Sequence, residues 1–315
     1  MYAVNLEPHG AGGPSAAYEA MFDLDEHYLG EGAEREMVLR ADPGRCQVLP
    51  HMRLAEWETL EWLMRSFARD YPEDFELDVS GDAWRWLNRP LGIVQDFTFG
   101  DAGTLPWPPL EYITRQAQGD FTLMDQRDGN LFLDGGMVTG AADWSLNFKL
   151  GMGFQQIHQP VPVAHELGVF DRSLRFLLKL KAEKPVRRVN WGLTVNPRLD
   201  MSSENRAVWA PDKLTVTAQN VGRIMCLRVE LQTLTRLPRS GAILFGIRTY
   251  LLRLEELVLV PKWAKRLHRV LRGLDPEIAA YKGMANYRQT ILDYLAPLDD
   301  GAATAPGRGP DVATL

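Results

Sequence analysis

The sequence predicts an α+β protein in which an antiparallel sheet is flanked by helices from both ends of the chain. Three observations support this class. Apolar residues recur at every third or fourth position from 53 to 70, which is typical of an amphipathic helix. Segments 120–140 and 228–251 each contain two β-prone runs joined by a turn, which predicts two hairpins. Segments 262–273 and 276–296 return to helical patterns.

The helix predicted at 53–70 has a continuous apolar stripe and is followed by a helix-terminating proline. Its members are Leu54, Trp57, Leu60, Leu63, Met64 and Phe67. Pro72 follows and cannot continue the helix. We expect the first third of the chain to be helical, interrupted by proline-rich turns such as LPWPPL at 105–110.

The first hairpin contains the strongest short turn signal in the chain. Asp128 and Gly129 lie between two β-prone runs, and Asp-Gly suits a tight turn in which both central residues need a positive φ. A short helix is expected at 171–181, with Asp171 as its N-cap and basic residues near its end. In the second hairpin, proline and glycine form the turn between the strands.

The 315 residues are enough for one large domain or two of ordinary size. We expect residues 1–50 to form an N-terminal extension, 51–298 a single domain and 299–315 a disordered tail, because the tail has too few apolar residues to order itself. Apolar residues make up 45% of the chain and charged residues 24%, as in soluble globular proteins.

Composition also excludes several classes. The net charge of −6 removes the general attraction to nucleic acid. No apolar run approaches the roughly 18 residues of a membrane span, and the first residues do not resemble a secretory signal. Two distant cysteines, Cys46 and Cys226, suit a reducing cytoplasm and are too few for an ordinary iron–sulfur cluster. We therefore expect a cytoplasmic protein without nucleic-acid or membrane partners.

Familiar nucleotide and metal motifs are missing. The chain has no G-x-x-x-x-G-K-[ST], G-x-G-x-x-G, H-E-x-x-H or G-x-S-x-G pattern. His158 and His165 are seven positions apart with Pro160 and Pro162 between them, which does not place two ligands on one helix. A paired-histidine metal site is not expected.

His158 lies in QQIHQPVP, where the following prolines restrict the backbone and fix the direction of the ring. From the residues alone, two interpretations are open. His158 is either a buried, hydrogen-bonded core histidine or a ligand. A single neutral imidazole held in this way suits the proximal position of a haem iron.

Three motifs, in this order, carry a family resemblance. They are WSLNFKLGMGFQQIHQPVP at 144–162, PVRRVNW at 185–191 and LRVELQTLTRLPRSGAILFGIRTYL at 227–251. Together they resemble the haem-dependent oxidative N-demethylase family, over residues 50–295 in our reading. The resemblance implies a PAS-like α+β fold that binds haem b, with His158 as the iron ligand. It also implies oxidation of dimethylamine to methylamine and formaldehyde with dioxygen, with electrons from separate flavin and iron–sulfur subunits.

Strand alternation places Arg228, Glu230 and Gln232 on one face, opposite the apolar residues. One interpretation is a solvated strand face with an exposed ion pair. Under the resemblance, Glu230 would instead receive the amine cation. Arg228 would keep that carboxylate ionised or hold a haem propionate.

Other residues within the motifs are weaker candidates. By charge, Arg187 and Arg188 are candidates to bind haem propionates, with plain surface arginines as the alternative. Trp191, together with Trp144, is a candidate pocket wall, with core packing as the alternative. The family's ERQTLRRLP pattern has basic residues where this chain has Leu231 and Thr235. These departures concern the substrate rather than the fold.

The basic run in 262–272 is either a solvated helix face or a dock for an acidic electron-transfer partner. Two rival functions are also open. The first is a haem-binding PAS-like gas or redox sensor without turnover, although no output domain is recognisable. In a third reading, it is a structural protein in which His158 is merely buried.

Overall fold

A computed structural model of the chain describes residues 6–10, 18–162, 168–182 and 184–302. Within these residues the strands form a seven-stranded sheet of order β1-β8-β9-β10-β6-β7-β2 and a three-stranded sheet of order β3-β4-β5. All strand pairs are antiparallel. The large sheet contains β1 (Glu7–Pro8), β2 (Cys46–Val48), β6 (Asp120–Arg127), β7 (Asn130–Met137), β8 (Val186–Val195), β9 (Met225–Arg236) and β10 (Ile243–Arg253).

Helices surround this sheet, so the α+β class is confirmed. They are α1 (Tyr28–Ala41), α2 (Arg53–Asp70), α3 (Pro109–Thr114), α4 (Leu146–Lys149), α5 (Phe154–His158), α6 (Val169–Leu178), α7 (Arg206–Trp209), α8 (Val221–Ile224), α9 (Leu254–Leu257), α10 (Pro261–Arg272), α11 (Pro276–Tyr281) and α12 (Arg288–Leu295). None of the helices in the described part of the chain has both the length and the apolar composition needed to cross a bilayer.

Both predicted hairpins are present. In the first, Asp128 (φ 52°) and Gly129 (φ 69°) connect β6 to β7, as expected for a two-residue turn in which both residues have positive φ. In the second, β9 and β10 stay in register from Ile243 opposite Arg236 to Arg253 opposite Cys226. This long, regular hairpin forms the centre of the large sheet.

The prediction that the first third is helical is wrong for residues 75–98. This segment forms the small sheet, β3 (Phe75–Ser80), β4 (Ala83–Asn88) and β5 (Ile93–Thr98). Along β4 the alternate residues Trp84 and Trp86 are buried, which is the period-two pattern of a half-buried strand, and Phe75 of β3 is buried with them. Gly81, with φ 61°, supplies the turn between β3 and β4.

Two helix boundaries also differ from the prediction. Asp171 does not cap α6, because the helix begins at Val169 after Gly168, and the Asp171 carboxylate instead accepts a hydrogen bond from Gln155 Nε2 at 2.6 Å. The segment 276–296 is two helices rather than one, because Gly283 has φ 67° and interrupts the helical backbone between α11 and α12.

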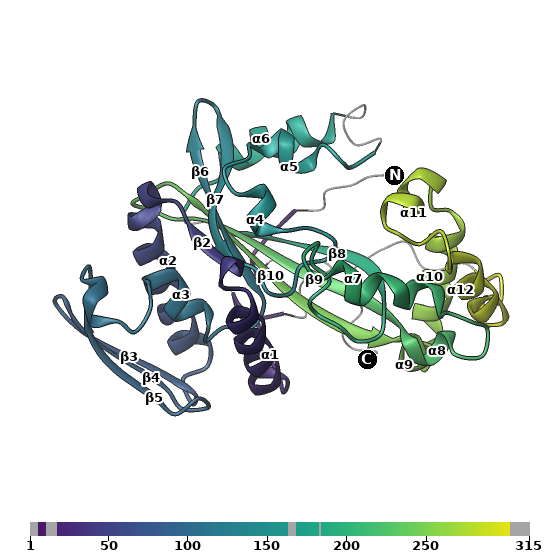
Figure 1. Cartoon of the computed structure of the whole chain (residues 1–315), viewed down its shortest axis with the longest axis horizontal. Helices are drawn as coiled ribbons and strands as arrows, with labels where there is room; N and C mark the ends of the chain where they lie inside the picture. The colour runs from purple at the N-terminus through teal and green to yellow at the C-terminus, as the bar shows by residue number, and fades with distance from the viewer. Residues whose placement is uncertain (1–5, 11–17, 163–167, 183, 303–315) are drawn as a thin grey trace.

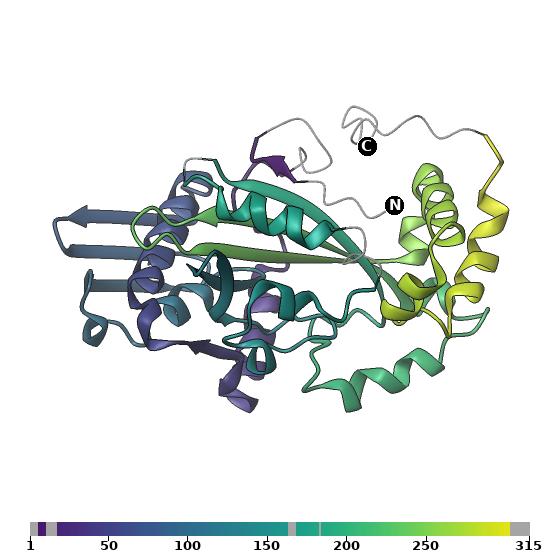
Figure 2. The same cartoon turned by 90° about the horizontal axis from the view of Figure 1, so that it is seen from above.

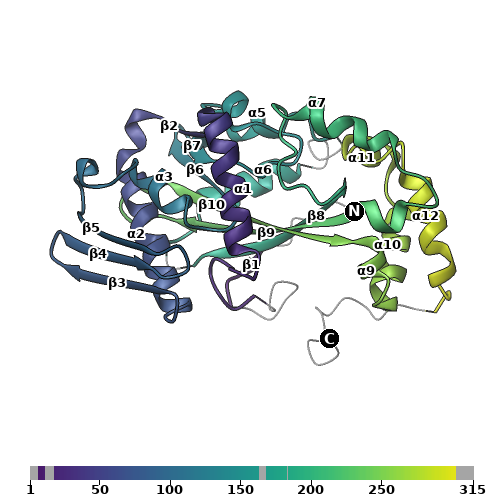
Figure 3. The same ribbon diagram turned by 60° about the horizontal axis from the view of Figure 1, so that its bottom comes forward.

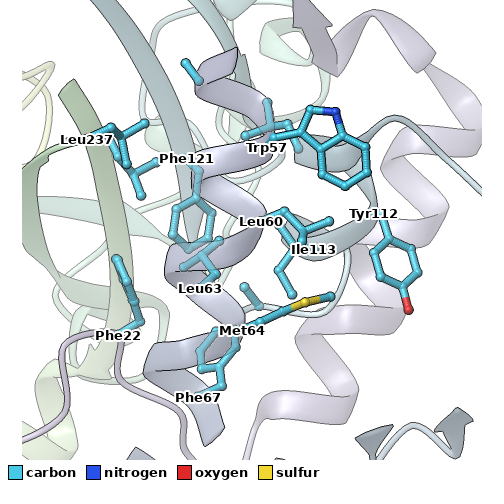
Figure 4. Close-up of a cluster of buried hydrophobic side chains, with 14 of the residues drawn as sticks. Phe22, Trp57, Leu60, Leu63, Met64, Phe67, Tyr112, Ile113, Phe121 and Leu237 are labelled. Carbon is cyan, nitrogen blue, oxygen red and sulfur yellow. The ribbon is translucent and has the colours of Figure 1, made fainter. Parts of the chain in front are cut away.

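The main core lies between α2 and one face of the large sheet. Figure 4 shows Leu60, Leu63 and Phe67 of α2 packing toward Phe121 of β6. The N-terminal segment takes part, because Phe22 is buried in the same cluster. Phe22 thus belongs to the main core, and the division of the chain at residue 50 stays a prediction. Of the predicted tail, 303–315 lie outside the described residues.

The two faces of the large sheet are covered by different elements. At the end of the sheet near the β6–β7 turn, α5 and α6 pack on the face opposite α2, against Val186, Leu234 and Ile243. The C-terminal helices pack against the far ends of β8, β9 and β10. Figures 1 and 2 show the small sheet and these C-terminal helices at opposite ends of the large sheet, and Figure 3 shows α1 lying across its strands.

Candidate functional site

His158 is the last residue of α5. Its Nδ1 lies 2.7 Å from the carbonyl oxygen of Phe154, one helical turn earlier. A carbonyl oxygen only accepts hydrogen bonds, so Nδ1 carries a proton and, in the neutral ring, the lone pair is on Nε2. The ring is packed by Phe154 and Phe170, with centroid separations of 4.4 and 4.6 Å. Metal-binding histidines are commonly oriented in this way by a backbone carbonyl.

A lysine supports the same short helix. Lys149, at the end of α4, donates from Nζ to the carbonyl oxygen of Ile157 at 3.2 Å. Its ammonium lies 5.4 Å from the ring centroid of Trp144. Burial lowers the pKa of Lys149. Lys149 thus holds the backbone that carries His158, and Trp144 of the same motif lies beside its ammonium.

A polar patch lies on β8 and β9, on the same face as α5 and α6. Arg188 is opposite Gln232, and Asn190 is opposite Glu230, so their side chains share this face. All five residues of β8 from 188 to 192 are half-buried, whereas the residues on either side of them are buried. The middle of β8 is therefore the accessible part of this strand.

The carboxylate of Glu230 is held by three side-chain hydrogen bonds within this patch. It accepts hydrogen bonds from Arg228 Nε at 3.3 Å, Asn190 Nδ2 at 3.1 Å and Gln232 Nε2 at 2.9 Å. Burial by itself would raise the pKa of Glu230, but Arg228 and the two amides outweigh it, and the pKa is lower than usual. The carboxylate is therefore ionised at neutral pH.

The interpretation of this face as a solvated strand with an exposed ion pair is wrong. The side chains of Arg228 and Glu230 are only 4% and 12% exposed. Arg228 also donates to the carbonyl oxygens of Leu199 and Gly140 and to the hydroxyl of Thr249. Its donors are committed to the protein, which favours a role in holding Glu230 over binding an external group.

Arg187 and Arg188 point to opposite faces of β8, as neighbours in a strand must. Arg187 is 1% exposed, and its guanidinium donates to the carbonyl oxygens of Tyr18 and Ala20. Arg188 is half-buried, and its Nε has no hydrogen-bond partner among the described residues. Burial lowers the pKa of Arg188, and Glu230 partly opposes this effect. Only Arg188 shares a face with Glu230.

Trp191 lies on the other face from Arg188 and packs against the C-terminal helices. Its carbonyl oxygen accepts a hydrogen bond from Lys282 Nζ at 2.8 Å, and the same ammonium lies 5.2 Å from the centroid of its ring. Lys282 follows α11 directly. Sequence reasoning missed this lysine, because nothing in its local pattern relates it to a strand ninety-one residues away.

The departures from the family pattern lie away from Glu230. Leu231 and Thr235 are each 1% exposed and point to the face covered by α2 and the C-terminal helices. They therefore leave the immediate surroundings of Glu230 unchanged.

Other charged clusters are ion-pair networks. His51, Asp125 and Asp134 lie close together, and Arg127 ion-pairs with both carboxylates. On the basic helix α10, part of the charge is neutralised by the segment that follows α12. The pairs are Lys265 with Asp300 and both His268 and Arg269 with Asp299.

The protein is thus an α+β fold with an oriented histidine, His158, near one end of the sheet. On β8, the Nε of Arg188 has no hydrogen-bond partner among the described residues, and Arg188 shares a face with the ionised carboxylate of Glu230. Haem iron commonly takes a histidine ligand and its propionates commonly pair with arginine, so the residue types His158 and Arg188 suit these two roles. The chain matches the model of the family described as haem-dependent oxidative N-demethylase, alpha subunit-like, over residues 14–292. It therefore belongs to this haem-dependent family, as the three motifs indicated.

Proposed function

We propose that this protein is the haem-binding catalytic subunit of an oxidative demethylase acting on a small secondary amine, with dimethylamine as the substrate. The observation that carries the proposal is the orientation of His158 by the Phe154 carbonyl, 2.7 Å from Nδ1. Together with membership of the family over residues 14–292, this supports His158 as the residue that would ligate the iron of haem b. In this proposal the sheet and its helices form a PAS-like haem-binding fold.

The protein's own residues have three roles in this reaction. His158 holds the iron, Arg188 binds a propionate and Glu230 receives the amine. When bound, haem supplies the redox chemistry with dioxygen, in which one oxygen atom leaves in formaldehyde and the other in water.

Glu230 suits the amine because dimethylamine is a cation at neutral pH. Its carboxylate is held ionised by Arg228, and one oxygen, Oε1, accepts only the 3.3 Å bond from Arg228 among the described residues. That oxygen has capacity for an N–H donor from the amine. Limited exposure of this carboxylate, 12%, makes the bond stronger than it would be in open water.

Electrons must come from another protein in this proposal. The chain has two cysteines and no dinucleotide loop, so it cannot hold its own ordinary iron–sulfur cluster or bind a nicotinamide by a familiar motif. We propose a flavin and iron–sulfur reductase as the partner, in the cytoplasm. The description of the family as alpha subunit-like supports a partner subunit.

The test has two steps. The purified protein should show an intense Soret band, and dimethylamine with a chemical reductant should drive consumption of dioxygen and release of formaldehyde. A Soret band without amine-dependent oxygen consumption would favour a haem sensor. A protein that takes up no haem at all would overturn both haem functions.

A further inference from the structure

Helix α6 contacts the candidate iron ligand on one side and solvent on the other. On its inner side, the ring of Phe170 lies 4.6 Å from the ring of His158, measured between centroids. Leu177 of the same helix is buried in the hydrophobic cluster against the large sheet. Figure 1 shows α6 beside α5 and apart from α10. The outer side of α6 is therefore a surface that lies close to His158.

This outer side is cationic. The exposed cations of α6 and of the segment that follows it are Arg172, Arg175, Lys179, Lys181 and Lys184. Asp171 is the only acidic residue at 169–182, and its carboxylate is engaged by Gln155 Nε2 at 2.6 Å. The chain as a whole has a net charge of −6. The surface of α6 is thus opposite in sign to the net charge of the protein.

The cations of α6 differ from those of α10 in their partners. On α10, Lys265 and Arg269 form ion pairs with Asp300 and Asp299. Within the described parts of the chain, no carboxylate forms an ion pair with Arg175, Lys179, Lys181 or Lys184. A cation that is already paired within its own chain gains less from an external carboxylate. The surface of α6 is therefore better suited than α10 to attract an acidic partner.

Phe176 gives the cationic surface an apolar centre. Its side chain is 41% exposed, between Arg175 and Lys179 along the helix. Protein interfaces combine an aromatic anchor with surrounding charges that steer the encounter. A helix of ten residues with a single exposed aromatic ring offers little apolar area to a bilayer. These features favour a protein partner.

We propose that the outer side of α6, centred on Phe176, is the docking surface for an electron-donating protein with an acidic surface. This inference rests on the proposed function, which requires electrons from outside the chain, and it places the dock on α6 rather than on α10. In each transfer, the reduced iron–sulfur centre of the donor loses one electron and the haem iron gains it. Docking on α6 keeps this transfer short because the same helix contacts His158.

The test measures how fast a reduced plant-type [2Fe–2S] ferredoxin, which is an acidic protein, reduces the haem-loaded protein. The site variant is Arg175→Glu with Lys179→Glu. Its matched control, Arg266→Glu with Arg272→Glu, makes two charge reversals at exposed positions of α10. Stopped-flow absorption of the Soret band under carbon monoxide gives the rate. Dithionite, a small reductant that needs no dock, shows that each variant holds reducible haem.

At low ionic strength, ferredoxin should reduce the site variant about ten- to a hundredfold more slowly than wild type, because complementary charge changes association rates on this scale. The α10 control should stay within about twofold of wild type. The difference should disappear at about 1 M salt, where exposed charges are screened. Phe176→Ser should slow the reaction at every salt concentration, because its contribution is apolar.

The outcomes separate this inference from the proposed function. If ferredoxin reduces the site variant as fast as wild type, the dock is not on α6, while reduction by dithionite leaves the haem function standing. Equal slowing of the α10 control would show a general effect of net charge and would also overturn the dock. Loss of binding to phosphatidylserine vesicles with an unchanged reduction rate would assign the surface to a membrane instead. If wild type takes up no haem, both proposals fall.

Discussion

The ammonium of Lys149 donates a hydrogen bond to the carbonyl oxygen of Ile157, 3.2 Å away, directly before His158. A second bond, between His158 Nδ1 and the Phe154 carbonyl, fixes the ring itself. The histidine is thus held at its backbone from α4 and at its side chain from within α5. Two different elements determine where Nε2 points.

Replacing Lys149 with Met should loosen this backbone. We expect haem to dissociate about five- to tenfold faster, because a hydrogen bond to a charged donor contributes on the order of 1.5 kcal/mol. The rate is measured by transfer of haem to an excess of an apo-globin. Lys149→Arg should restore it, and Lys179→Met, at an exposed lysine, is the control. An unchanged rate would show that the Ile157 contact is dispensable.

Replacing His158 with Ala should abolish haem retention or weaken it drastically. The iron loses its axial ligand, while the sheet and its circular dichroism remain largely intact because the ring lies on a short helix at the periphery. Added imidazole should partly restore the Soret band by entering the space left by the ring. Full haem content in the variant without imidazole would refute the assignment.

Replacing Glu230 with Gln should weaken binding of dimethylamine. A charge-assisted hydrogen bond is worth roughly 1.5 to 3 kcal/mol, so we expect a loss of about ten- to a hundredfold with near-normal haem content. The measurement is a titration with dimethylamine followed in the haem spectrum. Amine binding as tight as wild type would place the substrate elsewhere, and loss of haem instead would mean that Glu230 supports the cofactor.

Glu230 should also make the free energy of unfolding decrease as the pH falls. Its pKa in the folded protein is below 4.5, so its stabilising contribution is fully present above this pH and is lost as the pH falls through the folded pKa. The difference in unfolding free energy between wild type and Glu230→Gln should therefore shrink below about pH 4.5. Urea titrations of haem-free protein between about pH 7 and pH 3 measure it. A difference that grows toward acid would contradict the lowered pKa.

The chain alone should not turn over with a nicotinamide cofactor. Mixed with haem, dimethylamine, NADPH and dioxygen, it should release formaldehyde only after a reductase is added, because it lacks a dinucleotide loop and has too few cysteines for an ordinary cluster. Formaldehyde is measured by a colorimetric assay. Steady oxidation of NADPH coupled to amine loss by this polypeptide alone would overturn the need for a partner.

Local patterns predicted the elements whose signals are local. The stripe at 53–70 and the Asp128-Gly129 turn identified α2 and the β6–β7 hairpin, because periodicity and a positive-φ dipeptide act within a few residues. The small sheet was missed although its alternation was readable, because the helical pattern before it was extended too far. Gly81 was the available signal for its turn.

The candidate site was only partly predictable for a different reason. Strand alternation correctly placed Glu230 and Arg228 on one face. It does not indicate how deeply a face is buried, so it could not distinguish an exposed ion pair from a buried one. Asn190 joins them through strand pairing, which requires the register of β8 against β9. Lys282 directly follows α11 and reaches the Trp191 carbonyl across 91 residues of sequence, and such tertiary contacts leave no mark on the local sequence.

In the proposed function Arg188 binds a propionate and the chemically identical Arg187 does not, so the register of β8 against β9 decides which arginine is available for this role. A slip of one residue against β9 would exchange the two guanidinium groups, leaving the charge of each face unchanged. The slip is opposed by the loss of buried apolar contacts, because it would move Val186 and Leu193 out of their hydrophobic clusters and onto the wrong face. These two aliphatic side chains therefore help to keep Arg188, rather than Arg187, on the face of Glu230. A chain mispaired in this way would keep its composition, charge and strand content but would bring Arg187 to that face.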